Sequence, residues 1–127
     1  MSVAILGAGV MGETLLSGLL RAGRRAEDLL ISERRTERSK ELEERYGVDV
    51  VDNPTAARRA DTLVLVVKPQ DMGALLGEIA DHVRPGQLVV SLAAGITTAY
   101  LESRLPDGRP VVRAMPNTPA LVGLGAT

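Results

Sequence analysis

Residues 3–12 are Val3-Ala4-Ile5-Leu6-Gly7-Ala8-Gly9-Val10-Met11-Gly12. The four apolar residues predict a buried strand, and the pattern after residue 12 predicts a helix. In the G-x-G-x-x-G turn between them, Gly7 permits a tight turn, Gly9 lets a pyrophosphate approach the backbone, and Gly12 lets the helix pack closely on the sheet. Unpaired N–H groups at the helix start favour phosphate. The stretch therefore predicts the beginning of a dinucleotide-binding fold; the alternative is a glycine-rich turn without a ligand.

Apolar runs alternate with helical patterns along the rest of the chain. Further strands are expected at 29–32, 48–51, 62–67, 87–92 and 110–115. Helices are expected at 10–22, at 36–46, at 53–59 with Pro54 in the first position, from a cap at Asp71 to about residue 83, and at 97–104. This alternation predicts an α/β protein of Rossmann type, a doubly wound, mainly parallel sheet with helices on both faces. The ligand of such a sheet lies at the carboxyl ends of the strands.

Composition narrows the function classes. The 127 residues correspond to one domain, and a net charge of −1 argues against a nucleic-acid partner. The absence of cysteine excludes disulfides, thiolate nucleophiles and cysteine-metal sites, and it fits a reducing compartment. No signal peptide or membrane-spanning run is visible. We expect a cytoplasmic protein with no metal, nucleic-acid or membrane partner.

The last residues carry a separate expectation. Residues 120–127 are apolar and contain glycine, with no closing cap or polar tail. A chain with this ending looks like the first domain of a longer protein, either as a natural fragment or as a truncation.

Charged residues follow the second expected strand, in the run Ser32-Glu33-Arg34-Arg35. Glu33 lies about 20 residues beyond Gly12, where an acid commonly bonds the ribose 2′-hydroxyl of NAD. Arg34 and Arg35 would instead hold the 2′-phosphate of NADP. The structural alternative is the solvated start of a charged helix.

Two more loops follow buried strands. The first is Val66-Val67-Lys68-Pro69-Gln70, which we interpret as lying along the ribose and pyrophosphate of a cofactor. Its alternative is a plain strand-to-helix turn. The second is Ala93-Ala94-Gly95, whose small side chains allow close approach of a ring or ribose. Its alternative is tight packing of a helix on the sheet.

The loop after the last strand is Arg113-Ala114-Met115-Pro116-Asn117-Thr118-Pro119. Two prolines stiffen it, so Asn117 and Thr118 are suited to orienting a substrate at the nicotinamide end of a cofactor. Asn53 is a further candidate, with a helix cap as the alternative. His82, the single histidine, is interpreted as a surface or helix-terminal residue. With no catalytic acid or base in evidence, the chemistry we expect is hydride transfer by a bound cofactor.

Four of these segments occur together in one order: Ile5–Gly12, Val67–Gln70, Ser91–Gly95 and Arg113–Pro119. In this set the chain resembles pyrroline-5-carboxylate reductase, the last enzyme of proline biosynthesis. The resemblance implies NAD(P)H-dependent reduction of 1-pyrroline-5-carboxylate to L-proline, with NADP(H) favoured and NAD(H) open. Glu33 weakens the preference for NADP, because a carboxylate repels a 2′-phosphate unless it points away.

The resemblance also implies roles for individual residues. It places the pyrophosphate against Leu6, Gly7, Ala8, Gly9, Val10 and Met11, and the adenosine 2′ position against Ser32 and Arg34. Gly12 and Glu33 are cofactor-binding candidates from the sequence pattern itself. The rest of the cofactor would lie along Asn53, Val66, Val67, Lys68, Pro69, Ala93, Ala94 and Gly95, and Gln70 is a further candidate from the same loop. Asn117 and Thr118 would stand near the nicotinamide as the catalytic pair.

Family members carry a further helical domain that dimerises and completes the substrate pocket, and this domain is missing from residues 1–127. The isolated chain is therefore expected to turn over poorly. Two alternatives stay open: a non-catalytic dinucleotide-binding module, and the cofactor domain of another imine reductase or 2-hydroxyacid dehydrogenase.

Overall fold

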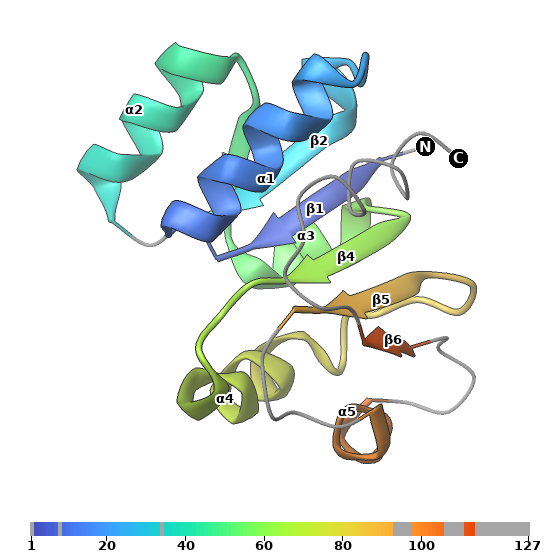
Figure 1. The fold of residues 1–127 in the computed structure, drawn as a ribbon. Helices are drawn as coiled ribbons and strands as arrows, with labels where there is room; N and C mark the ends of the chain where they lie inside the picture. Colours follow the sequence, from blue (N-terminus) through green and yellow to red (C-terminus); the bar gives the residue numbers. More distant parts are fainter. Residues whose placement is uncertain (1, 8, 34, 93–97, 106–110, 114–127) are drawn as a thin grey trace.

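The structure is a computed structural model that describes residues 2–7, 9–33, 35–92, 98–105 and 111–113 (Figure 1). Six parallel strands form one sheet in the order β3-β2-β1-β4-β5-β6. They are β1 Val3–Leu6, β2 Leu29–Ser32, β3 Asp49–Val51, β4 Thr62–Leu65, β5 Leu88–Ser91 and β6 Val111–Arg113. This topology confirms the doubly wound fold expected from the sequence.

Helices connect the strands. They are α1 Val10–Arg21, α2 Thr36–Tyr46, α3 Asn53–Arg59, α4 Pro69–Ile79 and α5 Thr98–Arg104, with a 3-10 turn at Ala26–Asp28. In Figure 1 the arrows of β1, β4 and β5 point to the same side, so the loops that leave these strands gather along one edge of the sheet. The order of strands reverses between β1 and β4, and such a switch point is where open α/β sheets bind ligands.

The central strand β1 separates two hydrophobic cores. Val3 and Ile5 pack with α1 and α2 on one face, whereas Ala4 and Leu6 pack with α3, α4 and α5 on the other. Successive side chains of a strand point to opposite faces, so four apolar residues in a row fit a strand that is covered on both sides. Every residue of β1 is buried.

Several element boundaries differ from those expected. The strand β4 ends at Leu65 rather than at residue 67, and α4 begins at Pro69 with Lys68 as its N-cap. The expectation that Asp71 caps this helix is therefore wrong. Proline suits the first turn of a helix because its fixed φ is helical and its missing N–H needs no partner there, so the helix starts three residues earlier than expected.

Two further details differ from the expectation, one at the start of α3 and one at the end of α4. The N-cap of α3 is Asp52, whose carboxylate accepts from the Thr55 amide at 2.8 Å, so Pro54 stands second in the helix instead of first. The helix α4 ends at Ile79 rather than near residue 83, and the amides of His82 and Val83 both bond the Ile79 carbonyl in a tightened last turn. Of the expected strand 110–115, only Val111–Arg113 lies within the described residues.

The turn between β1 and α1 brings two backbone segments into contact. Gly7 has a φ of +117°, and a Cβ there would come within 2.7 Å of the Val66 carbonyl oxygen. A Cβ on Gly12 would come within 2.1 Å of the Gly7 carbonyl oxygen. Both positions need glycine, the first for its backbone conformation as well as its size, and this confirms the packing role predicted for Gly12.

Glu13, in the first turn of α1, joins this helix to α2. Its carboxylate accepts a hydrogen bond from the Tyr46 hydroxyl at 2.7 Å and from Arg45 at 3.0 Å, and it also pairs with Arg38. The bonds from Tyr46, and next those from Arg38, hold the pKa of Glu13 below its usual range. The pair of helices is thus fixed at the end nearest the glycine turn.

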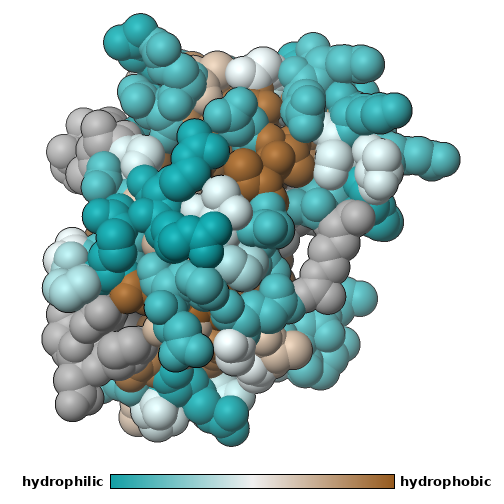
Figure 2. Space-filling view, turned by 180° about the vertical axis from the view of Figure 1, so that it is seen from behind, coloured by the Kyte–Doolittle hydropathy of each residue, from teal (hydrophilic) through white to brown (hydrophobic). Residues whose placement is uncertain are grey.

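The surface seen from behind in Figure 2 is mostly hydrophilic, with brown hydrophobic atoms limited to small areas. Among the described residues, Met11 is the large hydrophobic side chain that stays exposed, at 40%. No helix in the described ranges is both long and apolar enough to cross a membrane.

We expect Gly12→Ala and Gly77→Ala to change stability in opposite directions. The Gly12 variant forces a Cβ against the Gly7 backbone and should lower the free energy of unfolding by about 1–3 kcal/mol or more. Gly77 is exposed on α4 with no atom within 4 Å of its built Cβ, so alanine there should add up to about 1 kcal/mol through helix propensity. Urea unfolding measures both values. A Gly12→Ala chain as stable as the parent would contradict the close contact.

Glu13→Gln tests the link between α1 and α2 through its pH dependence. Because the folded-state pKa of Glu13 is lowered, its contribution is complete above the ordinary glutamate pKa of about 4.3 and is lost as the pH falls through the folded-state pKa. The variant should lose about 1 kcal/mol at pH 7, since the pair is partly exposed to water, and less below pH 4. Thermal unfolding at both pH values gives the comparison. An equal loss at pH 7 and pH 3 would show that the charge of Glu13 contributes nothing.

Candidate functional site

The start of α1 forms the first part of the site. Gly9 is the N-cap, and no side chain caps the helix there. The first backbone bond of the helix runs from the Glu13 amide to the Gly9 carbonyl at 3.0 Å, so the N–H groups of residues 10–12 have no partner in the helix. A Cβ built on Gly9 meets no atom within 4 Å. This exposed end with its positive dipole is suited to a phosphate group.

A cavity of about 810 Å³ opens beside this turn, where the strands end. It extends from Gly7 past the ends of β2 and β3 to the flank of α4. The residues that the sequence assigned to a cofactor and that border this cavity are Gly7, Ser32, Glu33, Arg35, Asn53 and Val67. The structure therefore brings together residues from four separate segments of the chain.

Ser32 connects the glycine turn to the next strand. Its side-chain hydroxyl accepts a hydrogen bond from the Gly7 amide at 3.3 Å, and the residue is 6% exposed. The serine thus holds the turn in place from the end of β2 while it also borders the cavity.

Glu33 does not point its charge freely into the cavity. Arg35 folds back on it: the Arg35 amide donates to Oε1 at 3.0 Å, and the guanidinium donates to Oε1 at 3.2 Å and to Oε2 at 3.3 Å. The Glu33 side chain is 8% exposed, whereas Arg35 is 71% exposed. The guanidinium of Arg35 therefore offsets the negative charge of this carboxylate.

Asn53 begins α3 and reaches across to α4. Its side-chain amide donates to Glu78 Oε2 at 3.1 Å, and both residues border the cavity. The alternative that Asn53 serves as the helix cap is wrong, because Asp52 fills that position. The Asn53 side chain is left to face the cavity and its partner on α4.

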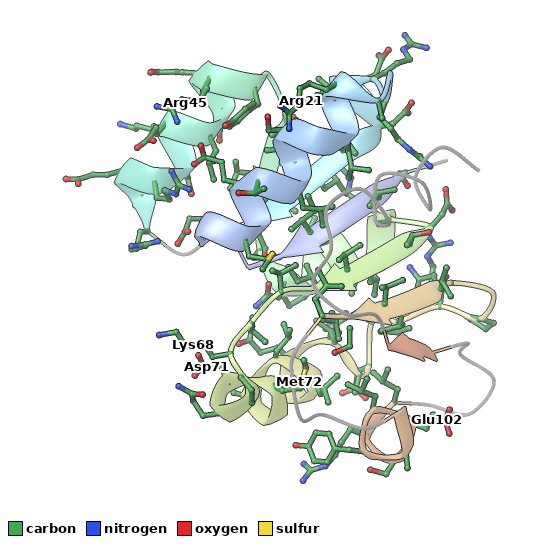
Figure 3. All side chains as sticks on the ribbon, viewed as in Figure 1. Arg21, Arg45, Lys68, Asp71, Met72 and Glu102 are labelled. Carbon is green, nitrogen blue, oxygen red and sulfur yellow. The ribbon has the colours of Figure 1, made fainter. Side chains whose placement is uncertain are left out.

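The segment after β4 divides between core and surface. Val66 packs into the core beside α1, whereas Val67 packs into the other core and borders the cavity. Lys68, Pro69 and Gln70 are exposed at the start of α4. Figure 3 shows Lys68 and Asp71 projecting from this end of α4. Of these two residues, only Asp71 borders the cavity.

A second cavity, of about 630 Å³, lies along the outer side of α1 and α2. Gly9 and Arg35 border it together with Arg21 and Arg38. Because Arg35 also borders the first cavity, the two openings meet beside the glycine turn. Two of these arginines are paired with glutamates, Arg35 with Glu33 and Arg38 with Glu13.

Several predicted site residues fall outside the described part of the chain: Ala8, Arg34, Ala93, Ala94, Gly95, Asn117 and Thr118. His82 is described, half-buried after the end of α4, with its Nδ1 3.0 Å from an Arg58 nitrogen, and it borders neither cavity. Within the described ranges, no group of three His, Cys, Asp or Glu side chains is placed to hold a metal ion.

Some cavity residues were not singled out from the sequence. Ala74, Leu75 and Glu78 border the cavity from one side of α4, and Asp52 borders it from the cap of α3. The aspartate before Asn53-Pro54 carries a capping signal that identifies its position. The residues of α4 have no such signal, because their part in the site depends on how α4 packs against α3.

Comparison with known proteins agrees with this geometry. The chain is 46% identical over 130 residues to the pyrroline-5-carboxylate reductase of Mycobacterium leprae, a match that covers 98% of this chain and 44% of that relative. Among solved structures it resembles a pyrroline-5-carboxylate reductase from Coxiella burnetii, with a TM-score of 0.86 and 33% identity over 95% of this chain and 46% of the other. A Plasmodium falciparum pyrroline carboxylate reductase with NADP bound matches with a TM-score of 0.77 and 27% identity, over 97% of this chain and 45% of the other.

These matches confirm the resemblance to pyrroline-5-carboxylate reductases that was inferred from the sequence. The chain spans about half the length of the relatives it matches. Residues 2–95 match the family model described as NADP oxidoreductase coenzyme F420-dependent. On this match, which covers more than half of the chain, the protein belongs to that NADP oxidoreductase family.

Proposed function

We propose that the chain is the cofactor domain of a pyrroline-5-carboxylate reductase, which forms L-proline by NAD(P)H-dependent reduction of the cyclic imine 1-pyrroline-5-carboxylate. The observation that carries the proposal is the cavity at the strand ends, bordered by the glycine turn, the β2–α2 loop, Asn53 and Val67. Its support is the 46% identity to a reductase of this name.

The described residues fit a dinucleotide. The uncapped start of α1 offers backbone N–H groups to a pyrophosphate, and Gly9 leaves the space that the phosphates need. Ser32 and Glu33 stand at the end of β2, where an adenosine ribose would lie. Leu6 and Val66 lie on either side of this turn, and the Val66 amide donates a hydrogen bond to the Leu6 carbonyl at 2.9 Å.

NADP(H) is the cofactor we favour, with NAD(H) as the alternative. Arg35 neutralises Glu33, which removes the repulsion that a bare carboxylate would exert on a 2′-phosphate. A reductase related to this chain has been solved with NADP bound.

The reacting end is assigned to the loops at 93–95 and 114–118. When bound, the reduced nicotinamide supplies the hydride for the imine carbon, while the imine nitrogen carries the proton that completes the amine. A stiff loop bearing Asn117 and Thr118 suits orientation of the two reactants, because neither side chain is a proton donor of useful strength. In this proposal the protein positions the reaction and the cofactor performs it.

We also propose that the full-length enzyme has a second domain. A second, helical domain would complete the substrate pocket and form the homo-oligomer, as the resemblance implies. The chain contains no cysteine, which suits the reducing cytoplasm where we place the reaction.

The full-length protein that contains this chain should oxidise NADPH when 1-pyrroline-5-carboxylate is supplied, and it should form L-proline in equal amount. The isolated 127-residue chain should bind NADPH but turn over poorly, because its pocket lacks the second domain. Absorbance of the reduced nicotinamide follows turnover, and mass spectrometry identifies the product. Gly9→Ala serves as the matched variant: its Cβ meets no protein atom, so the fold should persist while NADPH affinity falls about tenfold or more.

Turnover of a different imine or of a 2-hydroxy acid, with none of pyrroline-5-carboxylate, would refute the substrate. Efficient proline formation by the isolated chain would refute the division between two domains. Failure of both the chain and the full-length protein to bind NADPH or NADH would refute the cofactor site itself.

Arg35→Ala should shift the cofactor preference toward NADH. Without its partner, the Glu33 carboxylate repels the 2′-phosphate, and the ratio of NADPH to NADH affinity should fall roughly three- to tenfold, a modest change because Arg35 is largely exposed to water. Glu33→Gln combined with Arg35→Ala should restore most of the ratio. Calorimetric titration with both nucleotides measures it. If the double variant recovers nothing, Arg35 acts on the phosphate directly rather than through Glu33.

A further inference from the structure

Glu13 is an acidic residue close to the position assigned to the phosphates. Its amide donates the first backbone bond of α1 to the Gly9 carbonyl at 3.0 Å, and both residues border the second cavity. The Glu13 side chain is 22% exposed, so water screens its charge only in part. A carboxylate near the start of this helix would repel the phosphates of a dinucleotide unless its charge were offset or turned away.

Both oxygens of this carboxylate are bound to α2. Oε1 pairs with Arg38, which lies in the first turn of that helix. Oε2 accepts a hydrogen bond from the Tyr46 hydroxyl at 2.7 Å and another from Arg45 Nη1 at 3.0 Å. Of these three donors Tyr46 alone is uncharged, and its bond contributes most to the lowered pKa of Glu13.

The place of Tyr46 in the fold determines where the carboxylate is held. Because α2 connects the parallel strands β2 and β3, it begins at the edge of the sheet where the strands end and finishes at the opposite edge. Tyr46 is the last residue of α2, and α1 and α2 lie side by side over one face of the sheet (Figure 1). Its hydroxyl therefore draws the Glu13 carboxylate along α1, away from the N–H groups at the start of that helix.

The remaining contacts would hold the carboxylate less firmly. Among the described residues, Oε2 would keep only its contact with Arg45, whose side chain is 54% exposed. Exposed ion pairs fix a side chain weakly, because water competes for both partners. The second cavity, bordered by Gly9 as well as by Glu13 and Tyr46, leaves the carboxylate space to turn toward the glycine turn.

We propose that Tyr46 is a positioning residue for the dinucleotide: its hydroxyl holds the Glu13 carboxylate toward the far end of α2 and so limits the repulsion between this carboxylate and the phosphates. The inference rests on the proposed function, because it needs a phosphate-bearing ligand at the start of α1. Tyr46 itself touches no phosphate in this arrangement and acts through Glu13.

Tyr46→Phe removes the hydroxyl and keeps the ring that packs against the core between the helices. Calorimetric titration of this variant with NADPH at pH 7 should show roughly threefold weaker binding than the parent at low salt. The loss should disappear when the salt is raised from about 0.01 M to about 1 M, since the Debye length falls from about 30 Å to about 3 Å. Tyr100→Phe is the matched control: it removes a hydroxyl from α5, borders neither cavity and should bind like the parent.

Glu13→Gln supplies the second measurement, because glutamine carries no charge and retains an acceptor for Tyr46. Alone it should bind NADPH at least as tightly as the parent, and in the Tyr46→Phe background it should restore the affinity of the parent. Thermal unfolding shows that each variant is folded under the conditions of titration.

Three results would overturn the role of Tyr46 and leave the proposed function intact: equal binding by Tyr46→Phe and the parent at low salt, a loss that persists at about 1 M salt, and a double variant as weak as Tyr46→Phe. The last two would show that the bond to Glu13 acts by fixing the helices and not by controlling a charge. A parent protein that binds neither NADPH nor NADH would overturn the proposed function and this inference with it.

Discussion

The contact between Gly7 and Gly12 is the constraint on which the site depends. The Gly7 carbonyl lies where the Cβ of any other residue at position 12 would stand, and the positive φ of Gly7 turns the chain out of β1 beneath Val66. This close approach places the start of α1 directly at the end of the central strand. A larger residue at either position would move the helix away from the sheet edge, and with it the N–H groups that the site presents.

Other contacts extend this constraint to the neighbouring strand and helix. Ser32 accepts from the Gly7 amide, so the turn is held from β2 as well as from β4. Glu13, in the first turn of α1, is held by Tyr46 and Arg45 of α2. The glycine turn and the β2–α2 loop are consequently fixed relative to each other, which is what a ligand that spans both of them requires.

The strands and the glycine turn could be predicted because neighbouring residues determine both. A run of apolar residues indicates a strand that is buried on two faces, and a turn with a positive φ needs glycine. The start of α4 was still predicted at the wrong residue. Asp71 has the side chain of a helix cap, but proline prefers the first helical turn, and the helix begins at Pro69. The Asn53–Glu78 and Glu13–Tyr46 bonds could not be predicted, because each joins residues far apart in sequence through the packing of two helices. Residues 93–95, which the sequence assigns to the cofactor, lie outside the described ranges, and so do Asn117 and Thr118, which it assigns to the nicotinamide end.

Acidic side chains border the cavity that we assign to an anionic cofactor, and their charges would repel its phosphates unless they are offset. Glu33 is neutralised by Arg35, and Asp52 is bound to the first turn of α3, where the helix dipole favours its negative charge and the bonds from Thr55 lower its pKa. Glu78 accepts a hydrogen bond from the Asn53 side-chain amide, which stabilises its negative charge. A carboxylate of this kind is tolerable only away from the phosphates, where water and salt screen the repulsion.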